Sequence, residues 1–194
     1  MSRRRNAASS SVSDRREPPG RAGGLFIHVI ARGRRILTGL LAGLLLTVSA
    51  AQALPLIGEP APALKGHLFT GEEFDIARLR GKVVLVNFYS SYCKFCAYEI
   101  GLLEAFYEEH KDEGFEVIAI GVDAPEDRAR VERMLGIYNL PGTMADELTE
   151  SGYARRYPTP TAFIIDRDGI LRHRITGAKT PQHYREVLLP LLKR

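Results

Sequence analysis

Cysteine is scarce in this chain of 194 residues, which contains two cysteines and no tryptophan. Cys93 and Cys96 are separated by two residues, and no second cysteine pair accompanies them. A structural zinc site takes four ligands, usually including a second Cys pair or two His that lie three to five residues apart. The histidines are instead scattered, at His28, His67, His110, His173 and His183. The sequence therefore argues against a metal site.

Missing neighbours exclude covalent haem attachment and argue against a peroxidatic cysteine. Covalent attachment of c-type haem requires a histidine directly after the second cysteine, and Ala97 occupies that position. A peroxidatic cysteine would follow a proline at the place of Val86, although Ser90 fits the hydroxyl position of that motif. A static structural disulfide stays open as an alternative, but so short a loop gains little stability from its closure.

A hydrophobic run of the ~20 residues that span a membrane comfortably is missing as well. The basic residues 32–35 precede a shorter apolar stretch, residues 36–48, and then Ala-Gln-Ala at residues 51–53. This order is typical of a secretory signal peptide, and we expect cleavage after Ala53. Because a signal and a short anchor look alike, residues 31–53 are interpreted as a signal peptide or an N-terminal anchor. No cysteine lies near the cleavage site, which excludes a lipoprotein anchor.

Positive charge is concentrated in the leader. Residues 1–53 contain nine Arg and two acidic residues, whereas residues 54–194 contain 18 Lys and Arg against 21 Asp and Glu. The body is therefore not expected to bind nucleic acid. Residues 1–30 are polar and predicted to be disordered, and so long a preamble suggests a start codon assigned too early, with Val29 as the alternative start. Residues 54–194 have the length of one domain.

The most informative feature that is present is the sequence Cys-Lys-Phe-Cys at residues 93–96. It directly follows residues 83–89, a β-branched and aromatic run that predicts a strand buried on both faces. Residues 94–110 have the apolar spacing of a helix. A thiolate is stabilised at a helix N-terminus, so we expect Cys93 to be the nucleophile and Cys96 the resolving thiol of a thiol–disulfide exchange.

The rest of the body predicts alternating strands and helices. We expect strands at residues 64–68, 73–76, 115–122, 161–166 and 170–175, a short extended segment at 141–144, and helices at 124–138, 146–157 and 180–192. Asp146 and Thr180 are the expected N-caps of the last two helices. This order predicts an α/β fold around a central mixed sheet.

Together these segments resemble the thioredoxin superfamily, and within it the TlpA/ResA-type thiol–disulfide oxidoreductases of the cell envelope, over nearly all of residues 56–192. The family's Gly-x-x-Ala-Pro opening matches residues 58–62. Its Gly-Lys-Val-Val-Leu-Val-Asn-Phe run and Cys-x-x-Cys match residues 81–88 and 93–96, and its Pro-Thr-x-Phe-x-Ile-Asp-x-x-Gly segment matches residues 160–169. The resemblance implies a thioredoxin-like three-layer α/β/α sandwich.

The resemblance also implies roles for further residues. Pro160 aligns with the family's cis-proline, which would expose the backbone of Thr159 for pairing with an extended substrate segment. Glu99 follows Cys96 by three residues on the same helix face and is implied to assist proton transfer at the thiols, with a solvent-facing Glu as the alternative. Tyr92 replaces the family's usual Trp and either rims a substrate groove or simply packs.

Two other departures from the family bear on the chemistry. Lys94 should favour the thiolate of Cys93 and so make the disulfide more oxidising, which leaves the direction of electron flow open. Asn87 stands where thioredoxin itself has a buried Asp. An amide cannot shuttle protons, and we expect Asn87 to bond to neighbouring backbone.

The resemblance thus implies an exported thiol–disulfide oxidoreductase of protein substrates, located in the periplasm or anchored to the inner membrane. A reductase role in cytochrome c maturation or envelope thiol homeostasis fits best, with electrons from a membrane thiol donor and no soluble cofactor. The alternatives are a dithiol oxidase of the same fold and a module that binds Cu(I) or Zn through the two thiolates. Copper chaperones of this fold resemble Cys-x-x-x-Cys with a distant His, a spacing that residues 93–96 do not have.

Overall fold

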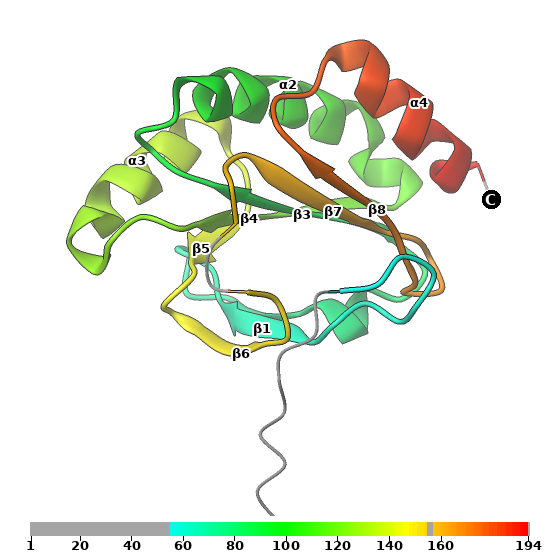
Figure 1. Ribbon diagram of the computed structural model, residues 1–194, viewed down its shortest axis with the longest axis horizontal. Coiled ribbons are helices and arrows are strands. Elements are labelled where there is room, and N and C mark those ends of the chain that lie inside the picture. The colour runs from blue at the N-terminus through cyan, green and yellow to red at the C-terminus, as the bar shows by residue number, and fades with distance from the viewer. Residues whose placement is uncertain (1–54, 155–156, 194) are drawn as a thin grey trace, which may run out of the picture. The chain divides into compact units, whose positions relative to one another are not determined.

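The computed structural model describes residues 55–154 and 157–193 (Figure 1). The predicted disordered segment 1–30 and the predicted signal peptide or anchor 31–53 lie outside these residues. In the described part of the chain no helix is both long and apolar enough to cross a bilayer.

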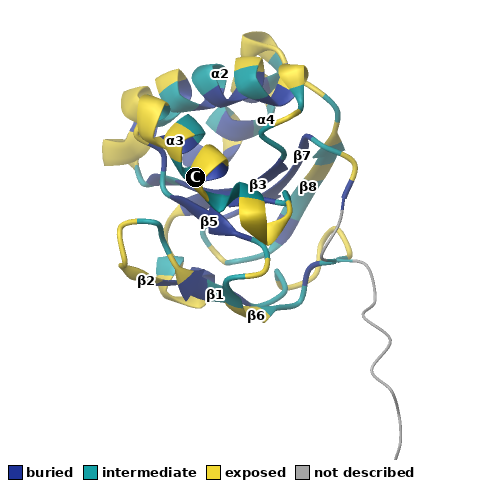
Figure 2. Cartoon of the chain, turned by 90° about the vertical axis from the view of Figure 1, so that its left-hand side faces the viewer, coloured by how far each residue is buried: buried dark blue, intermediate teal, exposed yellow. Residues whose placement is uncertain are grey.

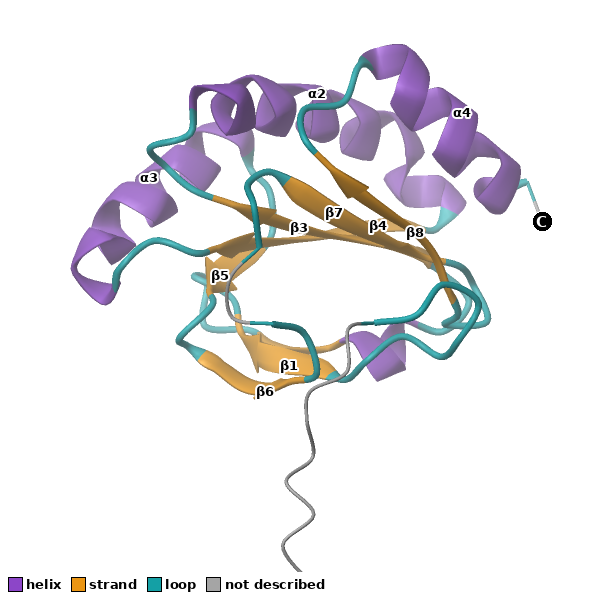
Figure 3. Cartoon of the chain, in the orientation of Figure 1, coloured by secondary structure: helices purple, strands orange, loops and turns teal. Residues whose placement is uncertain are grey.

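The architecture is built on a five-stranded mixed sheet of order β5-β4-β3-β7-β8. The helices α2, α3 and α4 lie over one face of this sheet, and a small sheet of order β2-β1-β6 lies under the other (Figure 3). The predicted α/β class with a central mixed sheet is confirmed. Among the described residues, however, the layer opposite the helices consists of the small sheet and a short 3-10 helix.

The central strand β3 (Val83–Tyr89) is buried at all seven positions. It pairs in parallel with β4 (Phe115–Gly121) and antiparallel with β7 (Thr161–Ile165), so that Val86 lies opposite both Ile118 and Phe163. A strand that is covered on both faces needs apolar residues at every position, which explains its unbroken hydrophobic run. Figure 2 shows β3 and β7 as buried throughout.

Alternate side chains of β3 point to opposite faces and thereby supply two separate cores. The core beneath the helices receives Val83, Leu85 and Tyr89 from β3, together with Ile100, Leu103, Phe106, Val131, Leu135, Tyr184 and Leu188 from the helices. The core above the small sheet receives Val84, Val86 and Phe88, together with Leu64, Phe74, Tyr153, Tyr157 and Phe163.

The helices begin where the sequence supplies caps. In α2 (Lys94–His110) the N-cap is Cys93, and in α4 (Pro181–Leu192) the hydroxyl of Thr180 accepts from the backbone N–H of His183. Both sets of bounds agree with the sequence-based expectation. The expected helix after β4 is a 3-10 turn, η4 (Pro125–Asp127), that leads into α3 (Arg128–Tyr138).

The remaining strands lie within one or two residues of their predicted positions. They are β1 (Leu64–His67), β2 (Glu73–Asp75), β5 (Gly142–Met144) and β8 (Leu171–Thr176). Two further short 3-10 helices are η2 (Ile76–Leu79) and η3 (Lys111–Glu113).

The predicted helix at residues 146–157, with Asp146 as its N-cap, is wrong. Leu148–Ser151 form strand β6, which pairs antiparallel with β1. A Cβ on Gly152 would lie 2.6 Å from Cβ of Pro62, so the chain here passes too close to its neighbour for a larger residue. Long-range pairing with β1 therefore overrides the local helical preference.

The double burial of β3 yields a stability prediction. We expect Leu85→Ala, which empties part of the core beneath the helices, to lower the free energy of unfolding by about 2–5 kcal/mol in urea denaturation. Ile137→Ala is the control, because Ile137 is 77% exposed and should change stability by no more than about 0.5 kcal/mol. Equal losses in the two variants would contradict this account of the core.

Candidate active site

The two cysteines lie where β3 hands over to α2, and they form a disulfide with Cα atoms 5.2 Å apart. The Sγ of Cys93 accepts the backbone N–H of Cys96 at 3.1 Å, so this sulfur caps the helix. The free N–H groups and the dipole of a helix N-terminus stabilise negative charge. The local geometry is therefore suited to a thiolate at Cys93 once the disulfide is reduced.

The two sulfur-bearing residues differ in their access to solvent. Cys96 is completely buried and packs in the core beneath the helices, whereas Cys93 is partly exposed. The neighbour Phe95 is 70% exposed. A large substrate can therefore reach Cys93 and not Cys96, which agrees with the order of attack expected from the sequence.

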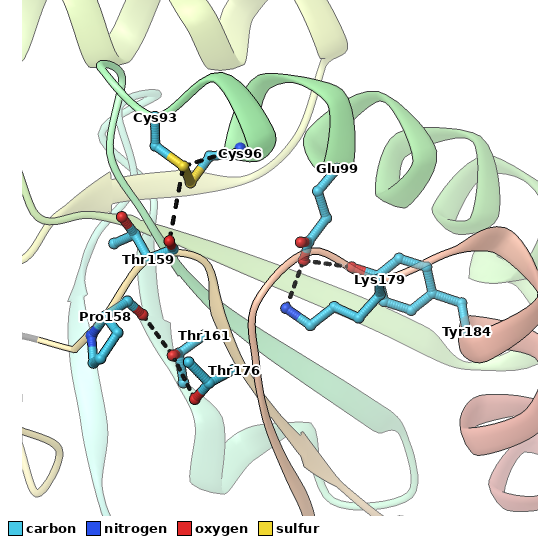
Figure 4. Close-up of polar contacts among 9 residues, drawn as sticks. All are labelled: Cys93, Cys96, Glu99, Pro158, Thr159, Thr161, Thr176, Lys179 and Tyr184. Atoms are coloured by element: carbon cyan, nitrogen blue, oxygen red, sulfur yellow. Dashed lines mark hydrogen bonds and ion pairs between the residues drawn. A yellow bond between two sulfur atoms is a disulfide. The ribbon is translucent and has the colours of Figure 1, made fainter.

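The loop that leads into β7, the neighbour of β3, lies against the disulfide. The Thr159–Pro160 peptide bond is cis, as the resemblance implies. The carbonyl oxygen of Thr159 lies 3.8 Å from Sγ of Cys93 (Figure 4). The hydroxyl of Thr161 donates to the carbonyl of Pro158 at 2.6 Å, and the N–H of Gly177 donates to that of Pro160 at 2.8 Å. Both bonds hold this loop in place beside Cys93.

The segment that precedes Cys93 is fixed by a carboxylate that the sequence analysis missed. Asp123 accepts from the hydroxyl of Ser90 at 3.0 Å, and from the backbone N–H and the hydroxyl of Ser91 at 3.0 and 2.9 Å. Asp123 follows β4 directly after Val122, and Ser90 follows β3. Because the carboxyl ends of adjacent parallel strands meet at one edge of a sheet, this contact had a recognisable signal in the sequence.

Tyr92 stands beside the disulfide with 61% of its surface exposed. Its hydroxyl donates to Asp127 at 2.6 Å, and the guanidinium of Arg130 lies 4.2 Å from the ring centroid. The hydrogen bond to Asp127 raises the pKa of Tyr92. Tyr92 is thus held at the surface by polar contacts instead of packing into the core.

Glu99 is completely buried, so the alternative of a solvent-facing Glu is wrong. One of its oxygens, Oε1, accepts from Nζ of Lys179 at 2.7 Å and from the hydroxyl of Tyr184 at 2.7 Å (Figure 4). Lys179 lies in the connection between β8 and α4 and is itself buried. A lone Lys in a loop carries no sequence signal for such a pairing, and the sequence analysis missed both partners.

Burial sets the direction of two pKa shifts around Glu99. It lowers the pKa of Lys179, although the adjacent Glu99 charge and hydrogen bond oppose this shift. It raises the pKa of Tyr184 well above its usual range, and Glu99 adds to that rise. Within the described residues the second oxygen of Glu99, Oε2, is buried without a hydrogen-bond partner.

Asn87 is buried beneath the same helices, and neither atom of its amide has a hydrogen-bond partner among residues 55–154 and 157–193. The expectation that it bonds to neighbouring backbone is therefore wrong. Its strand neighbours on either side, Ala119 and Ala162, already pair with β3 through their backbones, which leaves no free backbone group for the amide.

The cysteine pair offers two sulfur ligands to a metal and no more. In the part of the chain that the structure describes, no three His, Cys, Asp or Glu residues are grouped as a metal site requires. A closed tetrahedral zinc site takes four ligands, so the described residues do not fit one.

Comparison with known proteins gives a consistent set of relatives. A protein-family model described as the AhpC/TSA family matches residues 57–174. The thiol-disulfide oxidoreductase ResA of Bacillus cereus is 33% identical over 128 residues, which cover 65% of this chain and 73% of the relative. ResA of Halalkalibacterium halodurans is 30% identical over 141 residues, which cover 72% and 79%.

Solved structures show the same fold at lower sequence identity. A putative protein disulfide isomerase from Bacteroides thetaiotaomicron superposes with a TM-score of 0.60 at 24% identity and covers 72% of this chain and 92% of that one. A putative thiol:disulfide interchange protein DsbE from Chlorobium tepidum also gives 0.60, at 20% identity, and covers 71% and 99%. These two likenesses concern the fold.

The hydrogen bonds of Asp123 lead to a prediction about the stability of the protein. We expect Asp123→Ala to lower the free energy of unfolding by about 1–3 kcal/mol, because three donors of the loop before Cys93 lose a charged acceptor. Urea denaturation of the oxidised protein measures this loss. Asp112→Ala is the matched control, since Asp112 is exposed and its side chain has no hydrogen bond within the described residues. If Asp123→Ala changed the free energy of unfolding as little as Asp112→Ala, the hydrogen bonds of Asp123 would not stabilise this loop.

Proposed function

The chain belongs to the AhpC/TSA family and to the ResA-type thiol–disulfide oxidoreductases, and from this premise we propose that it reduces disulfides of protein substrates through Cys93 and Cys96. The observation that carries this proposal is the contrast between the two cysteines. A partly exposed sulfur caps α2, and a buried sulfur lies within bonding distance of it.

The reaction follows from that contrast in two exchange steps. The thiolate of Cys93 attacks one sulfur of a substrate disulfide, a mixed disulfide forms, and the other substrate sulfur leaves as a thiolate. Cys96 then loses its proton and attacks Sγ of Cys93, which releases the second substrate sulfur. The substrate gains two electrons, and the protein ends as the disulfide form.

Substrate binding is assigned to the loop beside the disulfide. The backbone of Thr159 faces Sγ of Cys93 across 3.8 Å, and cis-Pro160 follows it. An extended substrate segment that pairs with the backbone of Thr159 would bring its cysteine alongside Cys93, in the manner of strand addition. Tyr92 would form the rim on the opposite side, since Asp127 and Arg130 keep its ring at the surface.

Glu99 is assigned to proton transfer at Cys96. Both residues are completely buried on the inward face of α2 and lie three positions apart, where side chains of a helix are neighbours. Cys96 must be deprotonated before it attacks, and the amide of Asn87 on β3 cannot accept that proton. A carboxylate on the helix supplies the acceptor that the strand does not.

The cellular setting is part of the same proposal. A basic segment, an apolar stretch and Ala-Gln-Ala in residues 31–53 support export, with the leader either removed or kept as an anchor. In an oxidising compartment a reductase needs a supply of electrons, for which a membrane thiol donor is the proposed source. Proteins whose cysteines must be kept reduced, such as apocytochrome c, are the proposed substrates, and residues 54–194 are the proposed catalytic domain.

The expected trapping behaviour tests the order of attack. With Cys96→Ser we expect the protein to accumulate as a mixed disulfide with a substrate protein, because the resolving sulfur is gone. Non-reducing electrophoresis and mass spectrometry measure the trapped fraction. Cys93→Ser is the control and should trap nothing, since its remaining thiol is buried. Trapping by Cys93→Ser instead would reverse the two roles.

Stoichiometric Cu or Zn in the reduced protein, lost when both cysteines are replaced, would favour a metal-binding module.

The direction of electron flow is decided by the reduction potential of the Cys93–Cys96 couple. We expect a value near that of thioredoxin, about −270 mV, as measured by equilibration with glutathione or dithiothreitol buffers. The dipeptide Lys94-Phe95 favours the competing oxidase, because a cation beside Cys93 stabilises the reduced form. A value near −120 mV would establish the oxidase.

A further inference from the structure

We propose that Lys179 and Tyr184 are positioning residues for Glu99: they occupy its Oε1 and leave Oε2 as the atom that exchanges a proton with Cys96. This inference rests on the proposed function, in which Cys96 is deprotonated to resolve the mixed disulfide. It adds that the two oxygens of the Glu99 carboxylate have different roles.

The hydrogen-bond pattern carries the inference. Two donors from different elements, Nζ of Lys179 and the hydroxyl of Tyr184, converge on Oε1 at 2.7 Å each. No donor within the described residues reaches Oε2, although this oxygen is fully buried. A buried carboxylate oxygen without a partner is unfavourable, and it is the oxygen of Glu99 that is free to take a proton.

The burial of Cys96 requires an internal proton acceptor. Its side chain is completely buried, so its proton cannot pass directly to bulk water. Several titratable side chains lie in or against this layer. They are Glu99, Tyr107 and His110 from α2, Tyr89 from β3, Asp123 after β4, Tyr138 from α3, His173 from β8, Lys179 from the β8–α4 connection, and Tyr184 and His183 from α4.

Glu99 combines a place on the buried face of α2, three residues from Cys96, with a carboxylate oxygen that has no hydrogen-bond partner within the described residues. Both oxygens of Asp123, the other carboxylate, already accept hydrogen bonds from Ser90 and Ser91. Burial raises the pKa of Tyr89 and of Tyr184, so neither accepts a proton as a neutral phenol. His173 interacts with His183 of α4 and pairs across the sheet with Ile164. Ile164 lies on β7, farther from the Cys93 end of the sheet than Thr161, which pairs with Phe88.

Lys179 balances the charge that this role demands. A buried carboxylate without a counter-ion takes up a proton and could no longer accept one from Cys96. Nζ of Lys179 lies 2.7 Å from Oε1 of Glu99 and both side chains are buried, so Lys179 is the counter-ion of this carboxylate. When Oε2 takes the proton, Cys96 becomes the thiolate that attacks Sγ of Cys93.

The resolution step can be observed in isolation. The reduced full-length protein reacts with the aryl disulfide 5,5′-dithiobis(2-nitrobenzoate): attack by Cys93 releases one coloured thiolate, and attack by Cys96 on the resulting mixed disulfide releases the second. The rate of the second release is followed as a function of pH. We expect Lys179→Met to shift the pH profile of the second release to higher pH by about one unit or more. The rate of the first release should not change.

Conservative and control variants separate positioning from mere structure. Lys179→Arg, which keeps the charge, should restore most of the wild-type profile, and Tyr184→Phe should shift it in the same direction as Lys179→Met but less. Lys193→Met, at an exposed lysine, should change neither release. In a Glu99→Gln background, Lys179→Met should add no further shift, because Lys179 acts through Glu99. Should Lys179→Met alone fail to fold, this double variant and Tyr184→Phe carry the test.

The outcomes distinguish the two levels of the proposal. If Glu99→Gln slows the second release and neither Lys179→Met nor Tyr184→Phe shifts its profile, the positioning role is wrong and the proposed function stands. If Glu99→Gln leaves the second release unchanged, the proton-transfer role of Glu99 falls and the positioning role with it. If the wild-type protein gives no second release, the thiol–disulfide function itself is contradicted.

Discussion

The burial of β3 on both faces is the constraint on which the site depends. All seven of its residues are buried, and its neighbours β4 and β7 fix its register along the whole length. The strand therefore ends at a fixed point, and Cys93, which follows a short loop after it, caps α2. Asp123 and the Thr159–Pro160 loop come from the adjacent strands and reach the same edge. The position of the sulfur thus follows from the sheet and from the contacts that Asp123 and the Thr159–Pro160 loop make at its edge.

Burial also gives the two cysteines different chemistry within four residues of chain. The helix places Cys93 at its open end, where backbone N–H groups favour a thiolate, and it turns Cys96 inward among apolar side chains. A thiol in such surroundings resists ionisation. The same helix carries Glu99 into the layer below, and the β8–α4 connection and α4 supply its partners. Two segments that are distant in sequence thereby build one polar cluster inside an otherwise apolar core.

The sequence predicted what local patterns determine and missed what tertiary contacts determine. The bounds of β3 and α2 agree with prediction because an unbroken apolar run and a helical apolar spacing are strong signals. The segment at residues 146–157 was assigned to a helix because its local composition permits one, and only pairing with β1 makes it a strand. Cys93, Cys96 and Pro160 were recognisable from motifs. Lys179 was not, since an isolated lysine in a loop is normally a solvated residue. The adjacent sequence contains no pattern that predicts its burial against Glu99.

The unpartnered amide of Asn87 and the paired carboxylate of Glu99 show two ways in which a polar side chain is accommodated beneath the helices. A carboxylate at this position of β3 would lie in a layer where the adjacent backbone is already paired with Ala119 and Ala162, and it would need a cation of its own. Glu99 approaches the same layer from above, at the point where the β8–α4 connection can deliver Lys179. Because a buried charge is tolerated only with a counter-ion and hydrogen bonds, a buried carboxylate is expected where a cation can reach it, as Lys179 reaches Glu99. In this chain that place is the second turn of α2, one turn beyond Cys96.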